Sequence, residues 1–239
     1  MKPLFLLFFS TFCIAAAHAA EVDSVISNAR AELGSEAALE SVQALHYKGE
    51  VIGPDDKVLG KLELYFKKPY LQRLEFETDV SREITAVSPY DGYMQLIDLT
   101  GQDRGGIRVL GAAEVKRLMA NSLENLFFFK GPATQRRGET SLVGTETYEG
   151  KRAHRVRFSY SSGLLYERLF DAETGKLLAT ESDEGAVRLI EKASVVVDGI
   201  KFPKEVWTYE NGELVRKVLF SEIIVNPNLP DSLFDFPDA

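Results

Sequence analysis

Most hydrolytic and metal sites are built from histidine, serine and cysteine side chains, and this chain offers few arrangements of them. It has three histidines and one cysteine in 239 residues. Neither His46 nor His154 belongs to an HExxH pair, and His154 lies among arginines in a stretch that alternates like a strand. No serine occupies a Gly-x-Ser-x-Gly elbow. We therefore predict that the protein is not an enzyme and holds no cofactor and no metal.

The chemistry that the sequence does favour is the binding of an apolar ligand. Methionine and aromatic side chains adapt to irregular apolar molecules and suit such a pocket. The candidate lipid-binding residues are Leu118, Met119, Leu126, Phe127 and Phe129 on a helical segment and Leu64, Phe66, Phe76 and Trp207 on strands. The other interpretation is that these side chains fill an ordinary core, which is the usual fate of an apolar stripe. Both interpretations remain open at the level of the sequence.

Residues 1–19 have the pattern of a secretory signal peptide. Lys2 gives a positive start, an apolar run extends from Leu4 to Ala17, and Ala17 and Ala19 are the small residues that a signal peptidase recognises. The run is shorter than the roughly 20 residues that span a bilayer. We predict cleavage before Ala20 and export to the periplasm of a protein that does not span the membrane.

Composition limits how the exported part, residues 20–239, can be stabilised and which classes of partner it can bind. Its sequence contains no cysteine, because Cys13 lies in the leader, so its stability must come from its core rather than from disulfides. The full chain carries a net charge of −8. Such an acidic surface repels phosphate backbones, which argues against nucleic acid as a partner. We expect a monomer.

The elements that must position these residues are mostly strands. Two short helices come first, one capped by Asp23 and ended by Gly34, the other starting at Ser35. From His46 onward apolar and polar residues alternate between tight turns, which indicates an antiparallel meander. One segment, residues 111–129, has helical spacing and is stopped by Gly131-Pro132.

These elements predict a fold of the α+β class that is predominantly antiparallel β. Residues 20–239 show no linker of biased composition and are expected to form a single domain. A long sheet with one apolar face must curl around whatever it buries. We therefore expect an unclosed (half) β-barrel with helices covering the concave apolar face.

Several turn and strand-end motifs resemble those of one group of periplasmic proteins. The motifs lie at residues 33–39 (LGSEAAL), 170–177 (FDAETGKL), 197–204 (VDGIKFPK), 211–213, 220, 223–226 and 231–237. In this order they resemble the outer-membrane lipoprotein-sorting (LolA/LolB-like) superfamily. The resemblance implies an open barrel that holds acyl chains between sheet and helices. It also implies a regulatory basic residue, but no local pattern assigns that role to an arginine of this chain.

The resemblance implies a periplasmic carrier or chaperone that binds a lipoprotein acyl chain or another lipid. Its partners would be a lipid or acylated protein and an inner- or outer-membrane protein. The segment 111–130 is the expected movable element. The alternative is a periplasmic sensor or interaction protein that binds a membrane-protein partner. A third possibility is a scaffold subunit that uses an exposed sheet edge to add a strand of a partner.

Overall fold

A computed structural model describes residues 10–88, 91–102, 105–134, 137–182 and 185–237, with side chains from residue 21 onward. The described residues form a 13-stranded antiparallel sheet and a few helices. The strands are β1 (Ala44–Ile52), β2 (Val58–Lys67), β3 (Leu71–Glu77), β4 (Ser81–Val87), β5 (Gly92–Asp98), β6 (Gly106–Val109), β7 (Gly138–Tyr148), β8 (Lys151–Tyr160), β9 (Leu165–Asp171), β10 (Leu177–Ser182), β11 (Val187–Val197), β12 (Ile200–Glu210) and β13 (Glu213–Val225). The helices are α1 (Ser10–Leu33), α2 (Glu36–Ser41), α3 (Ala112–Phe127) and the short 3-10 helix η3 (Asp231–Leu233).

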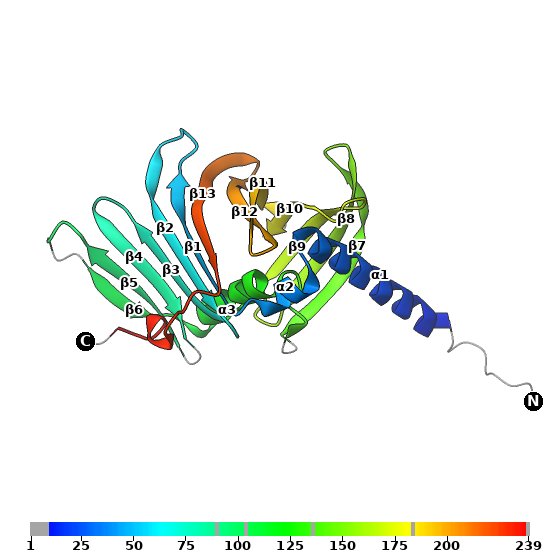
Figure 1. Cartoon of the computed structure of the whole chain (residues 1–239), viewed down its shortest axis with the longest axis horizontal. Helices are drawn as coiled ribbons and strands as arrows, with labels where there is room; N and C mark the ends of the chain where they lie inside the picture. Colours follow the sequence, from blue (N-terminus) through cyan, green and yellow to red (C-terminus); the bar gives the residue numbers. More distant parts are fainter. Residues whose placement is uncertain (1–9, 89–90, 103–104, 135–136, 183–184, 238–239) are drawn as a thin grey trace, which may run out of the picture.

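The chain builds the sheet outward from the middle and then inward again. β1 pairs with both β2 and β13, so the first and last strands meet in the middle of the sheet. The order of strands runs from β6 at one edge to β7 at the other. The connection between these two edges is α3, which packs against β2, β3 and β4 (Figure 1). The sheet is not closed, and the predicted half-barrel is confirmed.

Alternation along the strands gives the sheet its buried face, as predicted. In β2, Leu62 and Phe66 are buried, whereas Lys61, next to Leu62, is exposed. The predicted hairpin turns are also present. Asn211 and Gly212 join β12 to β13 with φ values of 49° and 86°, which is the backbone that an Asn-Gly turn favours.

The helices before the sheet are confirmed in number but not in length. Ser35 caps α2, and its Oγ accepts a hydrogen bond from the Ala38 amide at 3.2 Å. By contrast, α1 begins at Ser10, so Asp23 lies inside the helix and is not its N-cap. The alanine-rich sequence before Asp23 explains the difference, because alanine is the strongest helix former. Within the described residues, no helix is both long and apolar enough to cross a bilayer.

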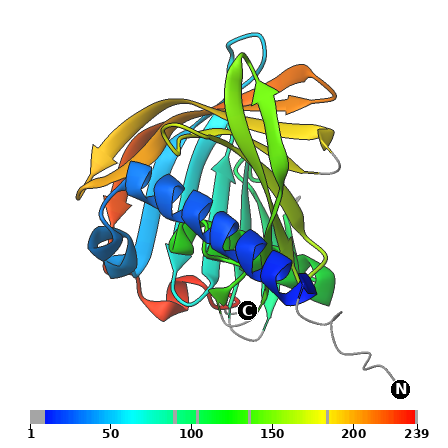
Figure 2. The ribbon, with the colours of Figure 1, turned by 90° about the vertical axis from the view of Figure 1, so that its right-hand side faces the viewer.

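α1 lies across the open side of the curved sheet (Figure 2). It packs against β7 and β12. Its buried residues Val22, Val25, Ile26 and Ala29 contact a cluster that includes Phe129, Val156, Phe158 and Phe170. A second cluster, under α2 and the end of α3, contains Leu39, Leu45, Phe66, Leu126, Ile200 and Phe202. The helices therefore supply the inner layer that the concave face needs.

Arg30 joins the three helices at one point. Its side chain is buried, with 2 % of the residue exposed. Its Nη1 donates to the carbonyl oxygens of Phe127 at 2.8 Å and Phe128 at 2.7 Å, which are the last residue of α3 and its C-cap. Its Nε and Nη2 donate to Glu36 of α2, both at 2.9 Å, and Nη2 also reaches Glu40 at 3.1 Å.

The same contacts explain where α3 ends. The sequence predicted a helix as far as Phe129, but Phe128 and Phe129 have φ values of 46° and 71°. A left-handed pair of this kind terminates a helix, and Arg30 satisfies the carbonyls that the helix leaves free. Gly131-Pro132 therefore follows the helix end and does not cause it.

Replacing Arg30 should destabilise the protein strongly. Arg30→Met keeps the length of the side chain but leaves two buried carbonyls unpaired, so we expect the free energy of unfolding to fall by about 3 kcal/mol. Arg30→Lys keeps the charge but loses the planar guanidinium, so its free energy of unfolding should lie between those of Arg30→Met and the wild type. Urea denaturation followed by circular dichroism measures both. Arg117→Met, on the exposed side of α3, is the matched control, and equal stabilities for the two methionine variants would contradict the prediction.

Candidate functional site

A cavity of about 380 Å³ lies on the concave face, beside α3. Strands from the middle of the sheet form its floor, and the end of α3 forms one wall. Its apolar lining comes mainly from β1, β2, β12 and β13. These residues are Tyr47, Leu62, Leu64, Phe66, Phe202, Val206, Val218 and Phe220. The concave face is therefore not completely filled by side chains.

The period of two puts these residues on one face. In β2, Leu62, Leu64 and Phe66 are two positions apart and all line the cavity. Across the neighbouring ladder, Tyr47 of β1 pairs directly with Leu64. Edge-to-face contacts order the aromatic rings, with centroids of Tyr47 and Phe66 6.1 Å apart.

The structure brings three of the nine predicted residues to this cavity: Leu64, Phe66 and Phe129. Phe76 pairs with Leu62 but packs over Gly60, outside the cavity. Leu126 is fully buried in the core beneath α3, and Phe127 is half-buried with the ammonium of Lys68 4.8 Å from its ring centre.

The remaining three predicted residues lie elsewhere. Met119 lines a smaller hollow beside Tyr160, and Leu118 is half-buried on α3 without reaching the cavity. Trp207 lies on the opposite face from the cavity, because its neighbours Val206 and Thr208 are the ones that point inward. There the ammonium groups of Lys192 and Lys217 stand 5.0 and 4.9 Å from its ring centre.

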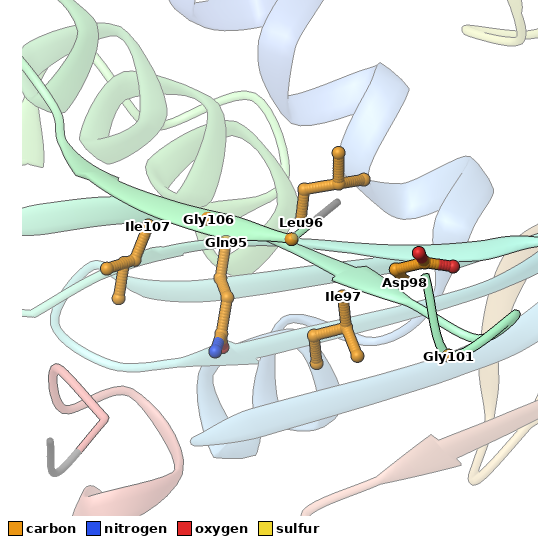
Figure 3. A pocket seen from close by; sticks show the side chains of 8 residues that line it. Gln95, Leu96, Ile97, Asp98, Gly101, Gly106 and Ile107 are labelled. Atoms are coloured by element: carbon orange, nitrogen blue, oxygen red, sulfur yellow. The ribbon is translucent and has the colours of Figure 1, made fainter. Parts of the chain in front are cut away.

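Another hollow, of about 480 Å³, lies at the free edge of the sheet along β5 and β6. Figure 3 shows that Leu96 and Asp98 point to one side of these strands, whereas Gln95, Ile97 and Ile107 point to the other. The hollow thus wraps around an edge and has no common floor. We do not assign it a ligand.

The part of the cavity under α3 is polar, which the sequence analysis did not predict. Glu124 of α3 accepts hydrogen bonds from the Tyr160 hydroxyl and from Nη1 of Arg168. The Arg168 guanidinium carbon lies 4.6 Å from the ring centre of Phe158 and 5.4 Å from that of Phe129. Burial, and then the neighbouring Glu124 carboxylate, raise the pKa of Tyr160, so its hydroxyl remains a hydrogen-bond donor.

Arg168 has unused hydrogen-bonding capacity. Only 8 % of the residue is exposed, and its Nε has no hydrogen-bond partner among the described residues. A buried polar group without a partner costs about 1–3 kcal/mol. Arg168 is therefore held by the ion pair with Glu124 and by ring faces, while its buried Nε–H is left without a partner among the described residues.

Glu191 is the second charged residue in the polar part. The pKa of its carboxyl is raised from 4.5 to about 6, mainly by burial and in smaller part by the nearby Glu32, while Arg168 and Lys176 lower it. Leu189, two positions along the same strand, is an apolar cavity residue. The signal that sequence reasoning missed is a charged residue at an inward position of an alternating strand, which both Arg168 and Glu191 provide.

The histidines have structural partners. His46 Nε2 lies 2.7 Å from Glu63 Oε2, and His154 Nδ1 lies 3.0 Å from the Thr145 hydroxyl. Neither residue lines the cavity. In the part of the chain that the structure describes, no three His, Cys, Asp or Glu side chains gather closely enough to hold a metal ion.

Because the pKa of Glu191 is raised, replacing it with the neutral glutamine should stabilise the folded protein, and by an amount that depends on pH. The folded state holds the proton between pH 4.5 and about 6, so the burial of Glu191 lowers stability as the pH rises through 6. We expect Glu191→Gln to raise the free energy of unfolding by up to about 2 kcal/mol at pH 7.5 and to change it little at pH 4. Urea denaturation at the two pH values measures this. Glu139→Gln, at an exposed position of β7, is the control, and a gain that is the same at both pH values would contradict the assignment.

Comparisons with known proteins reveal a shared fold. No family model and no curated protein sequence matches the chain. A solved structure of a DUF1329 family protein from Desulfovibrio piger aligns with a TM-score of 0.56 at 14% identity, over 90% of this chain and 97% of that one.

Two further matches carry names from the group that the motifs resemble. A putative outer membrane lipoprotein-sorting protein domain from Vibrio parahaemolyticus has a TM-score of 0.47 at 10% identity, and a LolA superfamily protein from Nitrosomonas europaea has 0.46 at 10%. Each alignment covers 90% of this chain and 97% of the other. The chain thus has the fold of the DUF1329 family protein, and the solved structures similar to it include LolA-superfamily and lipoprotein-sorting proteins.

Proposed function

We propose that this protein is a periplasmic carrier or chaperone that binds an acyl chain of a lipoprotein or of another lipid. The observation that supports this most directly is the cavity of about 380 Å³ with an apolar floor from β1, β2, β12 and β13. Pockets of this size hold one small organic molecule and bury most of its surface. Residues 1–19 would direct export and be removed.

The driving force for binding would be the removal of hydrocarbon from water. Each buried methylene contributes about 0.8 kcal/mol, so a few methylenes among Leu62, Leu64 and Phe66 suffice for useful affinity. Dispersion contacts with the rings of Tyr47 and Phe220 add to this. Nothing in this mechanism requires a bond to be made or broken, in keeping with a carrier rather than an enzyme.

The first test is native mass spectrometry of the protein purified gently from its own periplasm, followed by extraction and lipid analysis. A bound acylated molecule at near-stoichiometric amount would support the carrier and identify its cargo class. A bare protein that takes up no added fluorescent fatty acid would count against it. A co-purified protein without lipid would instead favour the sensor or interaction protein.

Filling the cavity should abolish binding. Val206 points into the cavity from β12, so Val206→Trp places an indole where the chain would lie. We expect the affinity for a fluorescent fatty acid to fall at least tenfold in a titration of its emission. Val143→Trp, at a position of β7 that is 47% exposed, makes the same exchange away from the cavity. Thermal unfolding of both variants verifies that they fold, and unchanged affinity in a folded Val206→Trp would exclude this cavity as the site.

A further inference from the structure

The register of the sheet aligns polar side chains in a row across the concave face. Arg168 of β9 pairs with Thr180 of β10, and Thr180 pairs with Leu189 of β11. Leu189 then pairs with Thr208 of β12, and Thr208 with Arg216 of β13. All five residues line the cavity. We call Arg168, Thr180, Thr208 and Arg216 the polar row.

The polar row has hydrogen-bonding groups that the protein does not use. Thr180 and Thr208 are 7 % and 2 % exposed, yet among the described residues their hydroxyls make no hydrogen bond. Arg216, exposed at the mouth of the cavity, makes no ion pair with any described residue, and Nε of Arg168 is unpartnered. A line of free donors between two guanidinium groups is complementary to an acceptor-rich, negatively charged group.

The carboxylates near the polar row do not cancel this preference. Glu124 is already engaged by Arg168 and the Tyr160 hydroxyl. Glu191 lies two residues along β11 from Leu189, and the positive charges of Arg168 and Lys176 act on its carboxyl and offset part of its charge. Arg216 supplies a positive charge that no described carboxylate neutralises.

The apolar floor begins where the polar row ends. Two residues along β12 from Thr208 is Val206, and two along β13 from Arg216 is Val218, followed by Phe220. The strands rise about 3.3 Å per residue, so Phe220 lies roughly 13 Å from the polar row. A molecule with its polar end on the row would extend its hydrocarbon over Val206, Val218 and Phe220.

We propose that the cavity takes a single-chain amphiphile whose anionic oxyacid headgroup, a carboxylate or a phosphate monoester, binds on the polar row between Arg168 and Arg216. This rests on the proposed function and specifies its ligand class. The volume of about 380 Å³ accommodates one such molecule. Binding satisfies donors that are otherwise unpaired, so headgroup and chain contribute separately.

The test compares three ligands with the same twelve-carbon chain: dodecanoate, lauroyl lysophosphatidic acid and the uncharged dodecanol. Each is titrated at pH 7.5 by displacement of a fluorescent probe, with wild type and with Thr208→Val/Arg216→Gln. A charge-assisted hydrogen bond network of this size should make at least one anion bind about tenfold more tightly than dodecanol. The double variant should lose that preference while its affinity for dodecanol stays within about twofold.

The control is Thr147→Val/Arg117→Gln, which makes the same exchanges at exposed positions of β7 and α3, and it should behave as wild type. The preferred anion identifies the headgroup as carboxylate or phosphate. A double variant that keeps the preference, or a wild type that binds dodecanol as tightly as both anions, overturns the proposed headgroup site. Failure of wild type to bind any of the three ligands overturns the proposed function itself.

Discussion

The guanidinium of Arg30 is the constraint on which the helical layer depends. It extends from α1 and lies buried beside α2 and the end of α3. It donates hydrogen bonds to carbonyl oxygens at the end of α3 and to carboxylates of α2. A cation at a helix C-terminus is stabilised by the helix dipole as well as by these hydrogen bonds. Glu36 responds to it, because the hydrogen bonds from Arg30 and then Lys130 lower the pKa of its carboxyl to about 2. By fixing where α3 ends, Arg30 also fixes Phe129, which turns back toward the cavity.

The motifs that carry the family resemblance lie where the helical layer contacts the sheet. Gly34 forms a bridge to Ile200, and a Cβ on Gly34 would lie 2.6 Å from the Gly199 carbonyl oxygen. Gly175, with a φ of 74°, approaches the Asn28 carbonyl of α1 equally closely. The motifs at 33–39, 170–177 and 197–204 are therefore the places where helices approach the sheet. Each is only a turn or a strand end, which is why each alone is a weak signal.

Local pattern predicted the strands, the central helix and the open barrel, because alternation and helical spacing are properties of neighbouring residues. It failed where the answer depended on distant segments. Val206 and Trp207 are adjacent apolar residues, so alternation alone does not determine which one faces inward, and the pairing with β11 and β13 decides it. Likewise, Glu124 and Arg168 come from an α-helix and a strand 44 residues apart, and no local pattern joins them.

The position of the cavity follows from the topology. Because the chain reaches one sheet edge at β6 and resumes at the other with β7, the connecting helix α3 must cross the concave face. It covers β2, β3 and β4, while α1 covers β7 and reaches β12. The middle strands between them receive less cover, and their inward side chains line the cavity. A filled core would need only apolar residues there, yet Arg168, Thr180 and Thr208 occupy inward positions. Their polarity is unfavourable in a dry core and becomes favourable when a polar group occupies the space above them.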